Sequence, residues 1–268
     1  MRLRLWRKKR SKSWKRLNYN NMTSAIEIRD ISKLYSKSEE YSLKNVSLKI
    51  NRGDKIGIFG PNGAGKTTLI SILCGIIEQS KGEIEYLKEG RITDLNSMLF
   101  KIGFVPQDLS LYSELSPKQN LMYFGSLYSI PKKKLQIKID ELLSVLGLTK
   151  VANKKIHTFS GGMKRRVNLA IGIINEPEIL FLDEPTVGVD VQSKNAIMSY
   201  LDALNKKGTT IIYTSHHMNE GQKFCNRFVL LDKGNLIVDD SMESLLSEHN
   251  EESLESLFLK LTGIEYRD

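Results

Sequence analysis

The sequence is poor in cysteine and contains no long apolar run. Cys74 and Cys225 both lie in apolar-rich segments and lack the spacing of a metal site, which excludes a disulfide framework. We expect both to pack as small apolar side chains, in a protein of the cytoplasm. A membrane-spanning helix needs about 20 consecutive apolar residues. Because runs such as 179–182 are far shorter, we expect no spanning helix.

The net charge of +9 belongs to one short segment. Nine of the 40 basic residues and none of the 31 acidic residues lie within residues 1–21, so the remaining chain is balanced in charge. With 268 residues, of which 40% are hydrophobic, the chain is long enough for one large domain, or for a domain with an inserted subdomain. The charge therefore does not describe the folded part of the protein.

Residues 1–21 form a basic leader for which two interpretations remain. Charged residues interrupt it throughout, so it is not a secretory signal. We favour a disordered leader upstream of a start at Met22. The alternative is a membrane-surface helix, whose apolar side would carry Leu3, Trp6, Trp14 and Leu17.

Hydrophobic periodicity predicts an α/β fold for the rest of the chain. Alternating segments at 25–31 and 46–50 indicate a small antiparallel β region, and a turn at 51–54 leads into a buried strand at 55–59. Near-continuous apolar or β-branched runs at 179–182 and 209–214 are typical of a parallel sheet that is covered on both faces.

Helical patterns fill the middle and the end of the chain. The segment from about 108 to 175 predicts an inserted helical subdomain, and residues 228–231 and 236–238 flank the turn of a hairpin. Apolar residues at helical spacing from 254 to 261 indicate a last helix. We therefore expect one main domain at 22–240 and a helical extension at 241–268.

A glycine-rich phosphate-binding pattern lies between a predicted strand and a predicted helix. It fits G-x-x-x-x-G-K-[ST], the P-loop. Its N–H groups would point at phosphate oxygens beside a helix N-terminus. We expect Lys66 to reach the β- and γ-phosphates and Thr67 to bind Mg²⁺. The predicted ATP-binding residues are Gly60, Pro61, Asn62, Gly63, Ala64, Gly65, Lys66, Thr67 and Thr68.

A second motif, ILFLDE at 179–184, has the form of a Walker B element. Its apolar strand delivers carboxylates to the carboxyl end of a sheet, where ligands bind in open α/β folds. We expect Asp183 to hold the Mg²⁺ shell, directly or through water. Glu184 follows it and is positioned to polarise the attacking water.

The segment FSGGM at 159–163 separates this chain from other P-loop ATPases. It resembles the signature loop of ABC transporter ATPases, usually written L-S-G-G-Q, with Phe159 and Met163 at the outer positions. The resemblance extends over about residues 25–240. It implies the ABC ATPase fold: a P-loop NTPase core with a mainly parallel sheet, an N-terminal antiparallel β region and an inserted helical subdomain.

The same resemblance assigns residues that are weak signals alone. Gln107 matches the Q-loop glutamine, which binds nucleotide and Mg²⁺, and Asp190 matches the D-loop. His216 matches the catalytic switch histidine; its neighbour His217 is the alternative. Tyr35 occupies the place of an aromatic that stacks on adenine, with Tyr41 as competitor. The catalytic set implied is thus Glu184, His216 and Lys66.

Members of this family work as dimers. In the dimer each ATP lies between the P-loop of one subunit and the signature loop of the other, so Ser160, Gly161, Gly162 and Asp190 would act in trans. The resemblance implies MgATP as the ligand and an integral membrane permease as a partner. The second cassette would be an identical copy or a close paralogue, and no nucleic acid is expected. We expect a peripheral location on the cytoplasmic face of the inner membrane.

Subfamily features favour export. The Gly-Val-Asp form of the D-loop, the basic residues after Met163 and the ending at 254–263 resemble ATPases of ABC-2 type exporters. The alternative is a cytosolic ABC-type ATPase that acts on ribosomes or nucleic acid. Such proteins usually carry two cassettes in one chain or a long coiled coil between their motifs, and neither arrangement is present.

Overall fold

The structure is a computed structural model that describes residues 24–36, 38–88, 91–216, 218–249 and 253–262. The predicted leader at 1–21 and the alternative residue His217 lie outside the described residues. None of the helices in these ranges combines the length and the apolar character that a bilayer crossing needs.

The smaller of the two sheets is antiparallel and contains the first described strand. It consists of β1 (Ser24–Leu34), β2 (Tyr41–Asn51), β4 (Lys81–Lys88) and β5 (Arg91–Thr93), in the order β2-β1-β4-β5. The predicted antiparallel region is thus confirmed. Strands β4 and β5 were not predicted, although β4 alternates polar and apolar residues from Glu83 to Tyr86; β5 has only three residues, too few for a pattern.

The larger sheet has the order β10-β9-β3-β8-β7-β6. Its strands are β3 (Lys55–Phe59), β6 (Ile102–Val105), β7 (Ile179–Asp183), β8 (Thr210–Ser215), β9 (Arg227–Asp232) and β10 (Asn235–Ser241). All neighbours pair in parallel except the β9–β10 hairpin. Strands β7 and β8 are buried at every position, as expected for strands covered on both faces.

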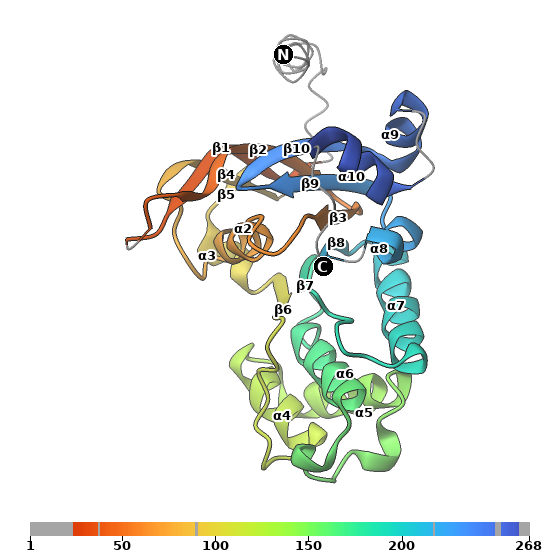
Figure 1. Cartoon of the computed structure of the whole chain (residues 1–268). Helices are drawn as coiled ribbons and strands as arrows, with labels where there is room; N and C mark the ends of the chain where they lie inside the picture. Colours follow the sequence, from red (N-terminus) through yellow and green to blue (C-terminus); the bar gives the residue numbers. More distant parts are fainter. Residues whose placement is uncertain (1–23, 37, 89–90, 217, 250–252, 263–268) are drawn as a thin grey trace.

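The described part of the protein has two hydrophobic clusters, one of which lies between the two sheets. Helix α2 (Lys66–Leu73) lies beneath the antiparallel sheet (Figure 1), and its apolar side chains join those of β1, β2 and β3 in a single cluster. Cys74 belongs to this cluster and Cys225 to the second one, and burial raises the pKa of both thiols. Both cysteines therefore pack as small apolar side chains, as predicted.

The remaining helices form groups around the larger sheet. Helices α4 (Pro117–Leu127), α5 (Lys132–Val145) and α6 (Gly161–Gly172) lie together at the end of the molecule opposite the antiparallel sheet (Figure 1). In sequence, α3 (Leu95–Leu99) precedes this group, and the 3₁₀ turns η2 (Thr149–Val151) and η3 (Ile156–Thr158) lie between α5 and α6. Helices α7 (Val191–Lys206) and α8 (Met218–Phe224) follow it.

Local sequence explains where several helices begin. Ser116 and Gln119 form a reciprocal capping box at the start of α4, with Pro117 in the first turn. Ser160 caps α6 and Asp190 caps α7 by a single hydrogen bond each, which the side chain accepts from the backbone N–H three residues further along the chain. Two predicted site residues thus also have a structural role as helix caps.

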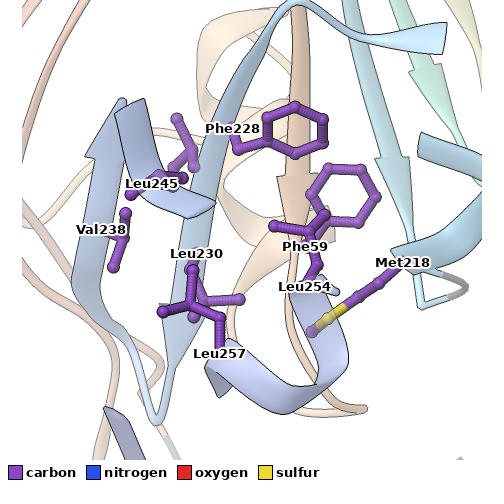
Figure 2. A pocket seen from close by; sticks show the side chains of 9 residues that line it. Phe59, Met218, Phe228, Leu230, Val238, Leu245, Leu254 and Leu257 are labelled. Carbon is purple, nitrogen blue, oxygen red and sulfur yellow. The ribbon is translucent and has the colours of Figure 1, made fainter. Parts of the chain in front are cut away.

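The last two helices cover the strands at one edge of the larger sheet. Helices α9 (Met242–His249) and α10 (Leu254–Thr262) lie over β9 and β10 (Figure 1). Figure 2 shows Leu245, Leu254 and Leu257 from these helices facing Phe59 and Met218 around a small apolar cavity. Its volume of about 10 Å³ is comparable to a single water-sized sphere, and its lining side chains are all apolar.

Candidate functional site

The P-loop turns sharply between β3 and α2. Gly60, Gly63 and Gly65 adopt positive φ angles of 150°, 81° and 105°. A Cβ atom at Gly60 would collide with the carbonyl of Leu231, and one at Gly65 with the carbonyl of Ser42. The loop therefore needs glycine both for its dihedral angles and for the close approach of neighbouring backbone.

The loop presents a cradle that suits phosphate. A Cβ atom at Gly63 would meet no atom within 4 Å, and the N-terminus of α2 has no side-chain cap and no acidic residue in its first turn. First-turn N–H groups of a helix attract anions when no side chain caps them. The loop thus offers the backbone donors that a nucleotide phosphate requires.

Lys66 is a buried cation at the base of this cradle. Its side chain is 6% exposed, and Nζ donates to the carbonyl oxygens of Gly60 at 2.7 Å and Pro61 at 3.2 Å. Desolvation lowers the pKa of Lys66, while the charges of Glu184 and Asp183 act in the opposite direction. A bound phosphate would supply further negative charge, so the site fits an anionic ligand.

Strand β7 delivers two buried carboxylates to its carboxyl end. Asp183 is 2% exposed and Glu184 is 5% exposed. The Thr214 hydroxyl, on the neighbouring strand β8, donates to Asp183 Oδ1 at 2.6 Å and accepts from the backbone N–H of Glu184 at 3.1 Å. Together with Thr67, an exposed residue in the first turn of α2, Asp183 offers the oxygen atoms that Mg²⁺ prefers as ligands.

Three predicted residues surround the Glu184 carboxylate. Gln107 Nε2 donates to Glu184 Oε2 at 3.2 Å. His216 Nδ1 lies 3.1 Å from Oε2, and Lys66 Nζ lies 3.9 Å from Oε1. These four side chains come from four separate segments of the chain, and the fold brings them to one point beside the P-loop.

Tyr35 lies next to the P-loop helix. Its ring is 42% exposed, its hydroxyl is 3.4 Å from Thr68 Oγ1, and Lys33 Nζ is 5.2 Å from its ring centroid. Tyr41, the competitor, is a half-buried residue of β2. Tyr35 is thus an exposed aromatic residue beside the predicted phosphate site.

The signature loop and the D-loop form a second group. An added Cβ atom at Gly162 would meet Asp190 Oδ2 and the Ser193 hydroxyl, so the two loops are in direct contact. Ser160 Oγ accepts from Met163 N at 3.3 Å. Ser160, Gly161 and Asp190 are exposed, and this edge of the molecule is open to a partner.

Sequence reasoning missed how the signature helix holds the Q-loop. Arg165 on α6 donates to the carbonyl of Gln107, and Asn168 Nδ2 donates to that of Pro106 at 3.2 Å. Burial lowers the pKa of Arg165, while Asp108 and Glu184 act to raise it. The available signal was the run of basic residues at 164–166, but only the fold shows that Arg165 is its buried member.

Known proteins resemble this chain over most of its length. The ABC transporter family model matches residues 43–187. A linearmycin resistance ATP-binding protein of Bacillus subtilis is 38% identical, over 83% of this chain and 71% of its own. A Nod factor export ATP-binding protein of Bradyrhizobium diazoefficiens is 33% identical, over 87% of this chain and 75% of its own.

Solved structures agree with these relatives. A dimeric ATP-binding cassette bound to ADP and Pi superimposes with a TM-score of 0.73 and 28% identity, over 81% of this chain and 98% of that one. The relatives do not favour the ribosome or nucleic-acid alternative. The chain therefore belongs to the ABC transporter family, as an ATP-binding subunit that hydrolyses ATP to power export.

Proposed function

We propose that Glu184 and its three neighbours form the hydrolytic centre of this ATPase. The observation that carries this proposal is the contact of one buried carboxylate with Gln107, His216 and Lys66. Glu184 accepts a proton from the attacking water, and His216 holds the carboxylate on the phosphate side. Lys66 stabilises the γ-phosphate charge.

The P-loop and Tyr35 bind the rest of the nucleotide. Residues 60–68 hold the phosphates through backbone N–H groups and Lys66, and the exposed Tyr35 side chain stacks on the adenine ring. Thr67, Gln107 and Asp183 would hold Mg²⁺. When bound, that ion neutralises charge on the β- and γ-phosphate oxygens.

We further propose that hydrolysis takes place in a head-to-tail dimer of identical copies or close paralogues. The exposed Ser160, Gly161 and Asp190, together with Gly162, would close over the nucleotide held by the partner's P-loop. Ser160 lies at the N-terminus of α6 and caps the Met163 N–H. Its hydroxyl hydrogen and the N–H groups of Gly161 and Gly162 would donate to the phosphate. ATP would then join the subunits, and its hydrolysis would release them.

The permease of this exporter would dock beside the Q-loop. Large apolar side chains are exposed in this region, where Tyr112 stacks with Phe124 and meets Tyr123 edge to face. The Q-loop is tied to α4 by Tyr112 N, which donates to Asn120 Oδ1 at 2.9 Å. A membrane subunit bound here would sense the position of Gln107 and would hold the chain at the cytoplasmic face of the inner membrane.

The Ser160→Arg variant tests the shared site. The change places a bulky cation on the face that must meet the partner, while Lys66, Asp183 and Glu184 of the same subunit stay intact. We expect ATP binding close to that of the wild type, with loss of ATP-dependent dimerisation and of hydrolysis. The measurements are calorimetric titration, size-exclusion chromatography and the ATPase rate as a function of protein concentration.

A mixing experiment provides the control. Excess Lys66→Ala protein supplies an intact signature loop to the P-loop of the Ser160→Arg variant, so any restored activity should be partial and should depend on concentration. Wild-type activity of Ser160→Arg alone, independent of concentration, would show that this loop takes no part in a shared site.

A further inference from the structure

Outside the proposed hydrolytic centre, Glu220 on α8 is a buried carboxylate with three polar partners. Its side chain is 6% exposed. Oε1 accepts from the Thr186 hydroxyl at 2.6 Å and from the Tyr213 hydroxyl at 2.8 Å, and Oε2 pairs with the Lys194 ammonium. The Thr186 and Tyr213 hydroxyls are also 3.1 Å apart. The network is therefore compact and centred on one carboxylate.

The partners of Glu220 lie on three segments close in sequence to Glu184, His216 and Asp190. Thr186 lies two residues after Glu184, and Tyr213 lies on β8, three residues before His216. Lys194 is on α7, four residues after Asp190, and Glu220 itself is four residues after His216. The position of α8 is thus linked to the D-loop, which leads from the site of one subunit to the dimer face.

Helix α8 is packed tightly on its other side. An added Cβ atom at Gly221 would collide with the ring of Phe59, which directly precedes the P-loop. Met218 faces Leu254 and Leu257 of α10 across the apolar cavity in Figure 2. Apolar contacts therefore seat the helix, while Glu220 connects it to the loops that carry chemistry.

Glu220 is ionised at neutral pH in this environment. Burial acts to raise its pKa, but hydrogen bonds from Lys194, Thr186 and Tyr213 outweigh burial and lower it below the ordinary value of 4.5. The pKa of Tyr213 is raised, chiefly by burial and also by the charge of Glu220, so its hydroxyl stays protonated and donates. A buried carboxylate with charge-assisted partners of this kind holds its neighbours in one geometry.

We propose that Glu220 is a positioning residue that holds His216 against Glu184 and couples this contact to the D-loop. The inference rests on the proposed roles of Glu184 and His216. Its consequence is specific, because the side chains that bind Glu220 are Thr186, Tyr213 and Lys194, and none of these is a predicted nucleotide-binding residue. Loss of Glu220 should slow hydrolysis and weaken dimerisation without weakening nucleotide binding by the monomer.

The Glu220→Gln variant keeps the size of the side chain and removes its charge. We expect kcat to fall about tenfold, as when a charge-assisted hydrogen bond is weakened, with the KM for MgATP changed by less than about twofold. Asp239→Asn is the matched control. Asp239 is similarly buried and makes a bidentate ion pair with Arg227, away from the hydrolytic centre, so this variant should lose thermal stability but keep its kcat.

Two further readouts separate positioning from a structural role. In a Glu184→Gln background, Glu220→Gln should raise about fivefold the protein concentration needed for ATP-dependent dimerisation, whereas Asp239→Asn should not. In a His216→Ala background, Glu220→Gln should cause no further loss of kcat, because it acts through His216. If Glu220→Gln does not fold, Tyr213→Phe removes one donor and keeps the ring beside Phe224; its kcat should fall about threefold.

The outcomes distinguish this inference from the proposed function. Wild-type turnover of His216→Ala would overturn the proposed role of His216. Wild-type kcat in Glu220→Gln, or in Tyr213→Phe where only that variant folds, would overturn the positioning role. If the losses of kcat caused by Glu220→Gln and His216→Ala were fully additive, the positioning role would also be overturned, because Glu220 would then act independently of His216.

Discussion

Replacing Glu184 by glutamine should separate ATP binding from ATP hydrolysis. The change keeps the size of the side chain and its ability to contact Gln107 and His216, at 3.2 and 3.1 Å in the wild type. It removes the negative charge, and with it the group that accepts a proton from water. The P-loop itself is unchanged.

We expect the hydrolysis rate to fall in this variant, whereas the affinity for MgATP should not fall. Loss of a positioned general base lowers the rate by about 10²- to 10⁴-fold, or about 3 to 5.5 kcal/mol in the barrier. Binding should not weaken. At 3.9 Å, Glu184 attracts Lys66 by about 4 kcal/mol at an effective dielectric constant of about 20. In the variant, Lys66 is free of this competing charge and the phosphates lose a nearby repulsive carboxylate.

Single-turnover hydrolysis, calorimetric titration with MgATP and size-exclusion chromatography test this expectation together. The variant should bind MgATP at least as tightly as the wild type, hydrolyse it at least about 100-fold more slowly and accumulate as an ATP-bound dimer. Glu178→Gln is a control, because it removes a carboxylate paired with Arg52 and Lys101 at the opposite end of β7. Turnover close to that of the wild type in Glu184→Gln would refute the role of Glu184.

Two further predictions concern single charged groups. Lys66→Ala should lower MgATP affinity at least about 100-fold by titration, because the cradle loses its buried cation, whereas the exposed control Lys206→Ala should bind normally; wild-type affinity would show that the loop is misinterpreted. Because the folded-state pKa of Glu220 is below 4.5, its contribution to stability is present at neutral pH and is lost as the pH falls through that pKa. Glu220→Gln should therefore melt at a lower temperature near pH 7 and lose less stability than the wild type between about pH 5 and pH 3; an unchanged acid response would contradict this account.

Local sequence determined the motifs and the elements that carry them. The glycines of the P-loop are required by backbone conformation and close approach within a few residues. The caps of α6 and α7 at Ser160 and Asp190 depend on side chains that reach N–H groups three residues on. Strands β7 and β8 were predictable because burial on both faces requires continuous apolar or β-branched runs.

Only the tertiary structure decided which side chains meet. Gln107 and His216 are separated from Glu184 by many residues, and no periodicity specifies that both contact its carboxylate. Arg165 and Glu220 resemble ordinary surface residues of helices in the sequence, but the fold buries them against a loop backbone and a polar network. Such long-range contacts depend on how strands and helices are ordered in space, and the periodicity of a single segment carries no information on that order.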